Sequence, residues 1–163
     1  MTFTSTWTPP IKLRDREPPA VVQRVERAGT YAGTTTAPVP KTEPKRNAHL
    51  LAMARGEACL LRVPGVCTGD NATTVACHSN WAEHGKAGAR KADDCYSVWG
   101  CAACHSWLDQ GKAPIEEKRR VWDGAFAWMR EIWLQITAGL LESTPKDRKA
   151  AAWALAQIEE ATA

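Results

Sequence analysis

The sequence lacks any long hydrophobic run, any apolar segment at its start and any strong excess of charge. No run approaches the roughly 20 apolar residues that a membrane span needs, so we expect no spanning segment and no membrane partner. The N-terminal residues contain no apolar core of the kind found in secretory signals, and we therefore expect the protein in the cytoplasm of the cell that makes it. The formal net charge of +3 does not indicate a globally basic nucleic-acid binder.

Charge and composition divide the 163 residues unevenly. Residues 1–46 hold eight Lys and Arg against four Asp and Glu, whereas residues 47–163 hold thirteen against fourteen. The first segment is rich in Pro and Thr and too poor in apolar residues to fold alone, which predicts an extended, largely disordered arm over 1–46. The remaining length suits one domain with a real core, and we find no internal repeat.

The first half of the folded region has the pattern of a mixed α and β unit. Strong helix formers over 47–56 predict a short helix. Two β-prone runs, at 73–78 and 95–100, are separated by a polar and glycine-rich loop over 79–94. A helix is then expected over 102–110.

Two further helices are predicted after Pro114. The last of them begins at Thr144, which is followed by proline at the first helical position. The first is long, and its apolar residues recur at intervals of three and four on one face, which should pack on the preceding unit. This face consists of Val121, Trp122, Ala125, Met129, Ile132, Trp133, Ile136 and Leu140.

The six cysteines favour a metal site over a disulfide framework, because a reducing compartment disfavours disulfides. Cys101 and Cys104 have the two-residue spacing typical of a zinc knuckle. Cys59 and Cys67 flank a Pro-Gly turn that can bring them together. Four thiolates complete a closed tetrahedral zinc site, and a closed site is structural.

Cys77 and Cys95 remain outside this set of four. We interpret them as small buried apolar residues. The alternative is that one of them replaces Cys67 as a ligand.

Two histidines stand at positions that suggest chemistry. His78 ends the first β-prone run, and His105 follows the cysteine knuckle at the start of a helix, so both imidazoles are expected in one cleft. A neutral imidazole can take a proton from water, while a second one can hold the ion that neutralises charge on a departing oxygen. This is the chemistry of phosphodiester hydrolysis.

The order of these motifs resembles the HNH, or ββα-metal, endonucleases, and more narrowly the small HNH nucleases encoded by phages and prophages. The resemblance implies an α+β fold with a small zinc-stapled ββα-metal core over 47–112, flanked by the N-terminal arm and by α-helices over 113–163 that pack on the core or on a partner. The motifs that carry it are Cys59-Leu-Leu-Arg-Val-Pro-Gly-Val-Cys67, Ala76-Cys-His78-Ser-Asn80, Lys91-Ala-Asp-Asp94 and Cys101-Ala-Ala-Cys104-His105.

The resemblance also implies roles for the two histidines. His78 is the general base that activates water, and His105 ligates a catalytic Mg²⁺ or Mn²⁺ that is separate from the structural zinc. Many family members have an acidic ligand before the base, where this chain has Cys77, and an asparagine before the second strand, where Asp94 is the nearest polar residue. Candidates for the remaining metal ligands or for substrate contacts are Asn80, His84 and Asp94.

The implied substrate is DNA, and the loop over 79–94 carries the cations that would contact its phosphates, namely Lys86, Arg90 and Lys91. The C-terminal helices are candidates for a homodimer interface. The rival interpretation is a non-catalytic zinc module that binds nucleic acid or a phage or host protein. A redox protein that uses the Cys-x-x-Cys pair is disfavoured, because no βαβ pattern surrounds the motif.

Overall fold

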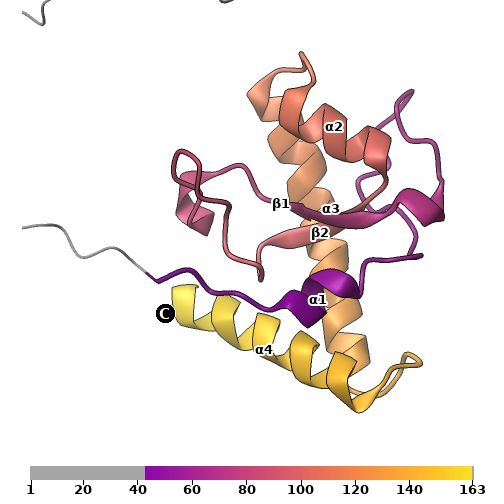
Figure 1. Cartoon of the computed structure of the whole chain (residues 1–163), viewed down its shortest axis with the longest axis vertical. Helices are drawn as coiled ribbons and strands as arrows, with labels where there is room; N and C mark the ends of the chain where they lie inside the picture. Colours follow the sequence, from indigo (N-terminus) through magenta and orange to yellow (C-terminus); the bar gives the residue numbers. More distant parts are fainter. Residues whose placement is uncertain (1–42, 163) are drawn as a thin grey trace, which may run out of the picture. The chain divides into compact units, whose positions relative to one another are not determined.

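The computed structural model describes residues 43–162. The arm predicted over 1–46 therefore lies outside the described residues except for its last part, 43–46. The described chain combines helices with a small sheet in the order α1, β1, β2, α2, α3, α4, which confirms the mixed helix and sheet class (Figure 1). None of the helices within this range is both long and apolar enough to cross a bilayer.

The sheet consists of two antiparallel strands, both of which lie in the predicted β-prone runs. β1 (Val75–His78) pairs with β2 (Ser97–Gly100), and the register sets His78 opposite Ser97. β2 is buried along its whole length, and α3 packs on it and runs behind the sheet in Figure 1. α2 (Ala102–Gln110) follows β2 almost at once and has the predicted bounds. The strand thus delivers the chain directly from the core to this helix.

The short helix α1 (Ala48–Ala52) packs on β1 and on the last helix. Its N-cap is Asn47, whose side-chain oxygen accepts a hydrogen bond of 3.1 Å from the Leu50 N–H. This cap satisfies one of the amide groups that a helix start leaves without a partner. The helix predicted over 47–56 is therefore present, although it is shorter than that segment.

The two long helices α3 (Ile115–Thr137) and α4 (Pro145–Thr162) pack against each other. The predicted start of α4 is confirmed, because the Thr144 N–H donates to Asp147 Oδ2 (2.8 Å) while the Asp147 N–H donates to Thr144 Oγ1 (3.2 Å). Such a reciprocal pair fixes the first turn of a helix. The sharp start turns the chain back at the end of α3, and α4 then runs at an angle to α3 and passes α1 (Figure 1).

Most of the predicted apolar face of α3 is buried, but Val121 and Ile132 are only half-buried and Leu140, beyond the helix end, is exposed. The prediction is wrong for Leu140, which is 76% exposed. The helix ends at Thr137, and Gly139, with φ of +74°, then turns the chain away. A glycine adopts this left-handed conformation at no steric cost. The members of the face that are buried are Trp122, Ala125, Met129, Trp133 and Ile136.

Gly100, at the end of β2, has no room for a side chain. A Cβ atom there would lie 2.6 Å from Cys77 Sγ and 2.7 Å from Leu61 Cδ1. Because both neighbours belong to the packed core, Gly100→Ala is expected to lower the free energy of unfolding by about 1–3 kcal/mol.

Gly124 provides the matched control, since it lies on the exposed side of α3 with nothing within 4 Å of an added Cβ. Gly124→Ala should raise the free energy of unfolding by about 0.5–1 kcal/mol through helix propensity. Denaturant unfolding of both variants measures the two effects. Changes of the same sign would contradict the packing described for Gly100.

Candidate functional site

Four of the six cysteines converge beside the start of α2. The Sγ atoms of Cys59, Cys67, Cys101 and Cys104 all lie within 4.8 Å of one another, and those of Cys67 and Cys101 are 4.0 Å apart. Sulfurs around a tetrahedral zinc ion, with Zn–S bonds of about 2.3 Å, would be about 3.8 Å apart. The donor set therefore fits a closed site after a small contraction and could hold a metal such as zinc.

The turn between the first two cysteines is held by local hydrogen bonds. The Cys67 N–H donates to the Val63 carbonyl (2.9 Å), and Gly65 takes a φ of +72° at the tip. The Leu60 N–H donates to the Trp99 carbonyl (2.8 Å), which ties the turn to β2. This turn therefore presents its two thiols toward the end of the same strand that leads into α2.

The other two thiols belong to the first turn of α2, where Cys101 is the N-cap. Burial alone would raise the pKa of the Cys101 thiol, but hydrogen bonds from the Cys104 backbone and from Thr68 lower it to about 6. Burial raises the pKa of the Cys104 thiol. A cation is needed to keep neighbouring buried sulfurs ionised together, which agrees with metal binding at this cluster.

Cys77 and Cys95 are both fully buried and lie outside the cluster. Burial raises the pKa of both thiols, that of Cys95 to about 12. They pack in the core as small apolar residues. In the structure Cys67 lies with the other three thiols of the cluster. Neither Cys77 nor Cys95 takes its place.

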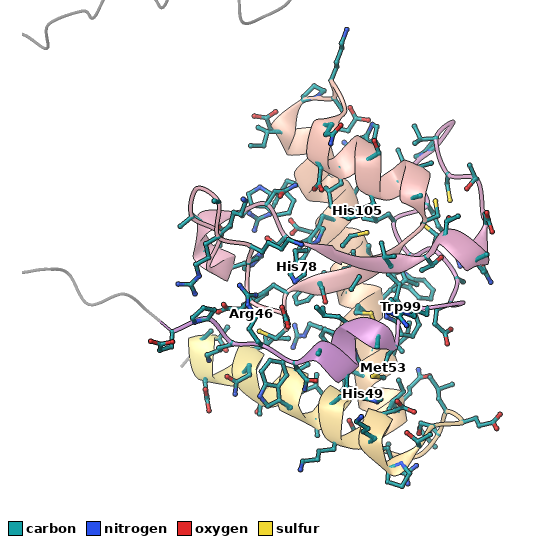
Figure 2. All side chains as sticks on the ribbon, viewed as in Figure 1. Arg46, His49, Met53, His78, Trp99 and His105 are labelled. Carbon is teal, nitrogen blue, oxygen red and sulfur yellow. The ribbon has the colours of Figure 1, made fainter. Side chains whose placement is uncertain are left out.

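A cleft of about 520 Å³ lies beside β1, α1 and α2. His78 and His105 both line it, together with Asn80 and Asp109. Figure 2 labels the two histidines, one at the end of β1 and the other on α2. The imidazoles that the sequence places in one cleft are thus brought together from two elements.

His78 is paired with a buried carboxylate. Its Nε2 lies 3.0 Å from Asp94 Oδ1, and the two side chains are 14% and 4% exposed. Burial alone would raise the pKa of Asp94, but hydrogen bonds from His78, the Asn47 N–H and Arg46 hold it below its usual value. Because the ionised Asp94 carboxylate can only accept hydrogen bonds, the Nε2 atom of His78 that faces it must carry the donated proton. In a neutral His78 ring the lone pair is then on Nδ1. The pair has the arrangement of a base and its orienting acid.

His105 has a carboxylate partner that the sequence analysis missed. Its Nε2 lies 3.2 Å from Asp109 Oδ2, one helical turn further along α2, and both side chains are partly exposed. Asn80 Nδ2 donates to the other oxygen of the same carboxylate (3.0 Å). The spacing of four residues within a predicted helix is the signal that could have found Asp109, because such residues share a face.

The structure places His84 outside the cleft, in an aromatic cluster. The Ser79 hydroxyl lies 2.6 Å from its Nδ1, and its ring stacks on Tyr96 with centroids 4.1 Å apart. Burial lowers the pKa of His84. The cluster, which also includes Trp122 and Phe126 of α3, anchors the loop over 79–94 on that helix. The contacts of His84 are therefore structural.

The cations of the loop lie around the cleft. Lys86 and Lys91 line it, and Arg55, which sequence reasoning did not single out, lies at the same cleft. Arg90 and Lys91 line an adjoining hollow of about 490 Å³ that also reaches His78. The cleft is thus lined by three cations, Arg55, Lys86 and Lys91, and by one carboxylate, that of Asp109.

A protein-family model described as "Putative nuclease YbcO" matches residues 48–138, which is more than half of the chain. The chain belongs to this YbcO family. The matched range contains both cleft histidines, their carboxylate partners and the four clustered cysteines, whereas Arg46 and Asn47 lie outside it.

Two curated YbcO relatives show the same likeness over a shorter stretch. The "Putative nuclease YbcO" of Escherichia coli (strain K12) and the "Putative nuclease ybcO" of Enterobacteria phage 82 are each 36% identical to this chain over 63 residues. These matches cover 39% of this chain and 65% of each relative, so less than two thirds of the relatives' length is spanned.

A solved structure also resembles this YbcO-family chain. It is described as "Structure of a putative bacteriophage protein from Escherichia coli str. K-12 substr. MG1655" and is 26% identical, with a TM-score of 0.41. The match covers 55% of this chain and 98% of that one.

Proposed function

We propose that the protein is a metal-dependent endonuclease of phage or prophage origin that hydrolyses phosphodiester bonds of DNA. The observation that carries the proposal is the pair of histidines in one cleft, each with its own carboxylate partner. The family to which the chain belongs, and the phage source of one relative, support the same class.

The order of elements supports the HNH, or ββα-metal, type of nuclease. His78 ends the first of two antiparallel strands, and His105 lies on the helix that follows the second strand. The four clustered cysteines would hold a structural zinc ion next to this unit. Zinc would then fix the start of α2, and with it the position of His105.

His78 would act as the general base. Nδ1 of the neutral ring takes a proton from the attacking water, and ionised Asp94 stabilises the imidazolium that forms. Because the carboxylate is buried and bonded to several donors, it holds the ring in one orientation. Asp94 is in this proposal a positioning residue for the base and not a metal ligand.

His105 and Asp109 would hold the catalytic Mg²⁺ or Mn²⁺. When bound, the ion supplies charge neutralisation at the departing oxygen. Asn80 fixes the Asp109 carboxylate through its side-chain amide. The cations that position the DNA backbone would be Lys86, Arg90 and Lys91.

A series of Mg²⁺, Mn²⁺ and EDTA on plasmid and single-stranded DNA tests the function. We expect cleavage with Mg²⁺ or Mn²⁺ and none after chelation, in protein whose zinc content is measured in parallel. DNA binding without cleavage under any of these ions would contradict the proposal and favour the non-catalytic zinc module.

Asp109→Ala tests the ion site separately. The loss of the outer partner of a metal ligand typically costs about 10–100-fold in affinity, and the loss of a ligand should cost no less, so the Mn²⁺ concentration for half-maximal cleavage should rise at least about tenfold. Asp123→Ala is the matched control, because Asp123 also pairs with a residue four positions away, Arg119, but does not line the cleft. If both variants respond equally to Mn²⁺, Asp109 is not a ligand.

A further inference from the structure

The chain segment just before α1 closes over the carboxylate that orients the proposed base. Arg46 Nη1 donates to Asp94 Oδ1 (3.0 Å) and to the Ala92 carbonyl (2.6 Å), while Nη2 donates to the Lys91 carbonyl (3.1 Å). The Asn47 N–H donates to Asp94 Oδ2 (2.7 Å). One guanidinium thus links the carboxylate to the loop backbone that precedes it.

Backbone contacts continue this attachment. The Asp94 N–H donates to the Lys45 carbonyl (3.0 Å), and the Lys45 N–H donates to Asp93 Oδ1 (3.1 Å). The segment 45–47 is therefore fixed to the end of the loop along three consecutive residues. Figure 2 labels Arg46 on the extended segment that leads into α1 and His78 at the end of β1, and both residues line the same hollow.

The hydrogen bonds of Asp94 explain why Arg46 matters. Oδ1 accepts from Arg46 and from His78, and Oδ2 accepts from the Asn47 N–H. The side chain is 4% exposed, so little water is available to replace a lost donor. A buried carboxylate that loses a charged partner pays a large desolvation cost and relaxes by moving or by taking up a proton. Either change releases the imidazole that it orients.

We infer that Arg46 is a positioning residue of the nuclease site: it holds Asp94 in the place where this carboxylate keeps the His78 ring oriented with Nδ1 as the base. The inference rests on the proposed function. Arg46 lies outside the residues that the family model matches, so the site would extend beyond the family region into the segment that precedes it.

Steady-state cleavage by Arg46→Ala and Arg46→Lys tests the inference. For Arg46→Ala we expect kcat to fall about 10–100-fold, as for other outer partners of catalytic groups, with KM within about twofold. Arg46→Lys should recover part of kcat, because an ammonium can reach Asp94 but cannot also bond both carbonyls as the guanidinium fork does. Arg148→Ala is the matched control, since Arg148 Nη1 also donates to a backbone carbonyl, that of Ser143 (2.7 Å), at the start of α4.

Three kinetic results overturn the inference. The first is a kcat of Arg46→Ala within twofold of the wild-type kcat, and the second is a loss that lies in KM, as for a phosphate contact. The third is an equal loss of kcat in Arg148→Ala. Nitrogen NMR of the His78 ring reports its tautomer without any cleavage. It therefore separates a failure of this inference from a failure of the proposed function. The Nε2–H tautomer should predominate in the wild type and in Arg148→Ala, and a mixture should form in Arg46→Ala. An unchanged tautomer in Arg46→Ala overturns the inference, whereas an inactive wild type with the expected tautomer change overturns only the function.

Discussion

Cys104→Ser is expected to lose its zinc and to unfold at a much lower temperature. A serine oxygen is a poor substitute for a thiolate, and structural zinc sites contribute their binding free energy to folding. The chain around Cys59 and Cys67 contains only turns and a single 3-10 turn at Asn71–Thr73, and apart from zinc it is held by the Leu60–Trp99 hydrogen bond and by the buried side chains of Leu61 and Val63. A loss of roughly 3–5 kcal/mol would lower Tm by about 10–20 °C.

Zinc analysis and thermal melting of purified protein measure this effect. Cys95→Ala is the matched control, since Cys95 is equally buried but lies outside the cluster. It should keep one zinc per chain and lose only the packing of a small side chain, about 1 kcal/mol. Full zinc content in Cys104→Ser, or zinc loss in Cys95→Ala, would show that the cluster is not the site.

His78→Ala is expected to reduce cleavage by about 10²–10⁴-fold, the contribution typical of a general base. Zinc content should be unchanged, because His78 lies at the end of β1 and the zinc ligands lie elsewhere. The Asp94 carboxylate keeps two of its donors in the variant, Arg46 and the Asn47 N–H, so the fold should persist. Single-turnover cleavage at saturating Mg²⁺ measures the loss.

His49→Ala is the control for this variant, because His49 Nε2 also bonds a carboxylate, Asp147 Oδ1, at 2.7 Å. This second pair joins α1 to α4 and does not line the cleft. We expect a small loss of stability and unchanged cleavage. Equal activity of the two variants would remove His78 from the role of base.

Much of the site could be predicted because its residues lie in short motifs. The spacing of Cys101, Cys104 and His105 at a helix start is visible in the sequence, and so is the turn between Cys59 and Cys67. α3 and α4 were predictable too, since helical periodicity and a Thr-Pro start are local signals. Local patterns of this kind determine which helices and strands form. They also determine the order in which the candidate metal ligands follow one another along the chain.

What could not be predicted depends on contacts between distant residues. Arg46 and Asp94 are 48 positions apart, and no periodicity relates them. Asn80 and Asp109 are 29 positions apart and meet at the cleft, while the aromatic cluster anchors the loop over 79–94 on α3. His84 belongs to that cluster, although as a lone loop histidine it resembles a catalytic candidate. Its surroundings, which the sequence does not show, determine its role.

α2 carries the proposed ligands of two ions within nine residues, the thiols that could hold zinc at its start and His105 with Asp109 beyond them. Nucleating a helix is costly, and zinc bound to the thiols at the first turn of α2 would offset that cost. The two metals would therefore bind in a fixed order during maturation of the newly made chain. If the proposed function holds, zinc would load first, and the supply of zinc in the cell would then set how much of the protein becomes competent to cut.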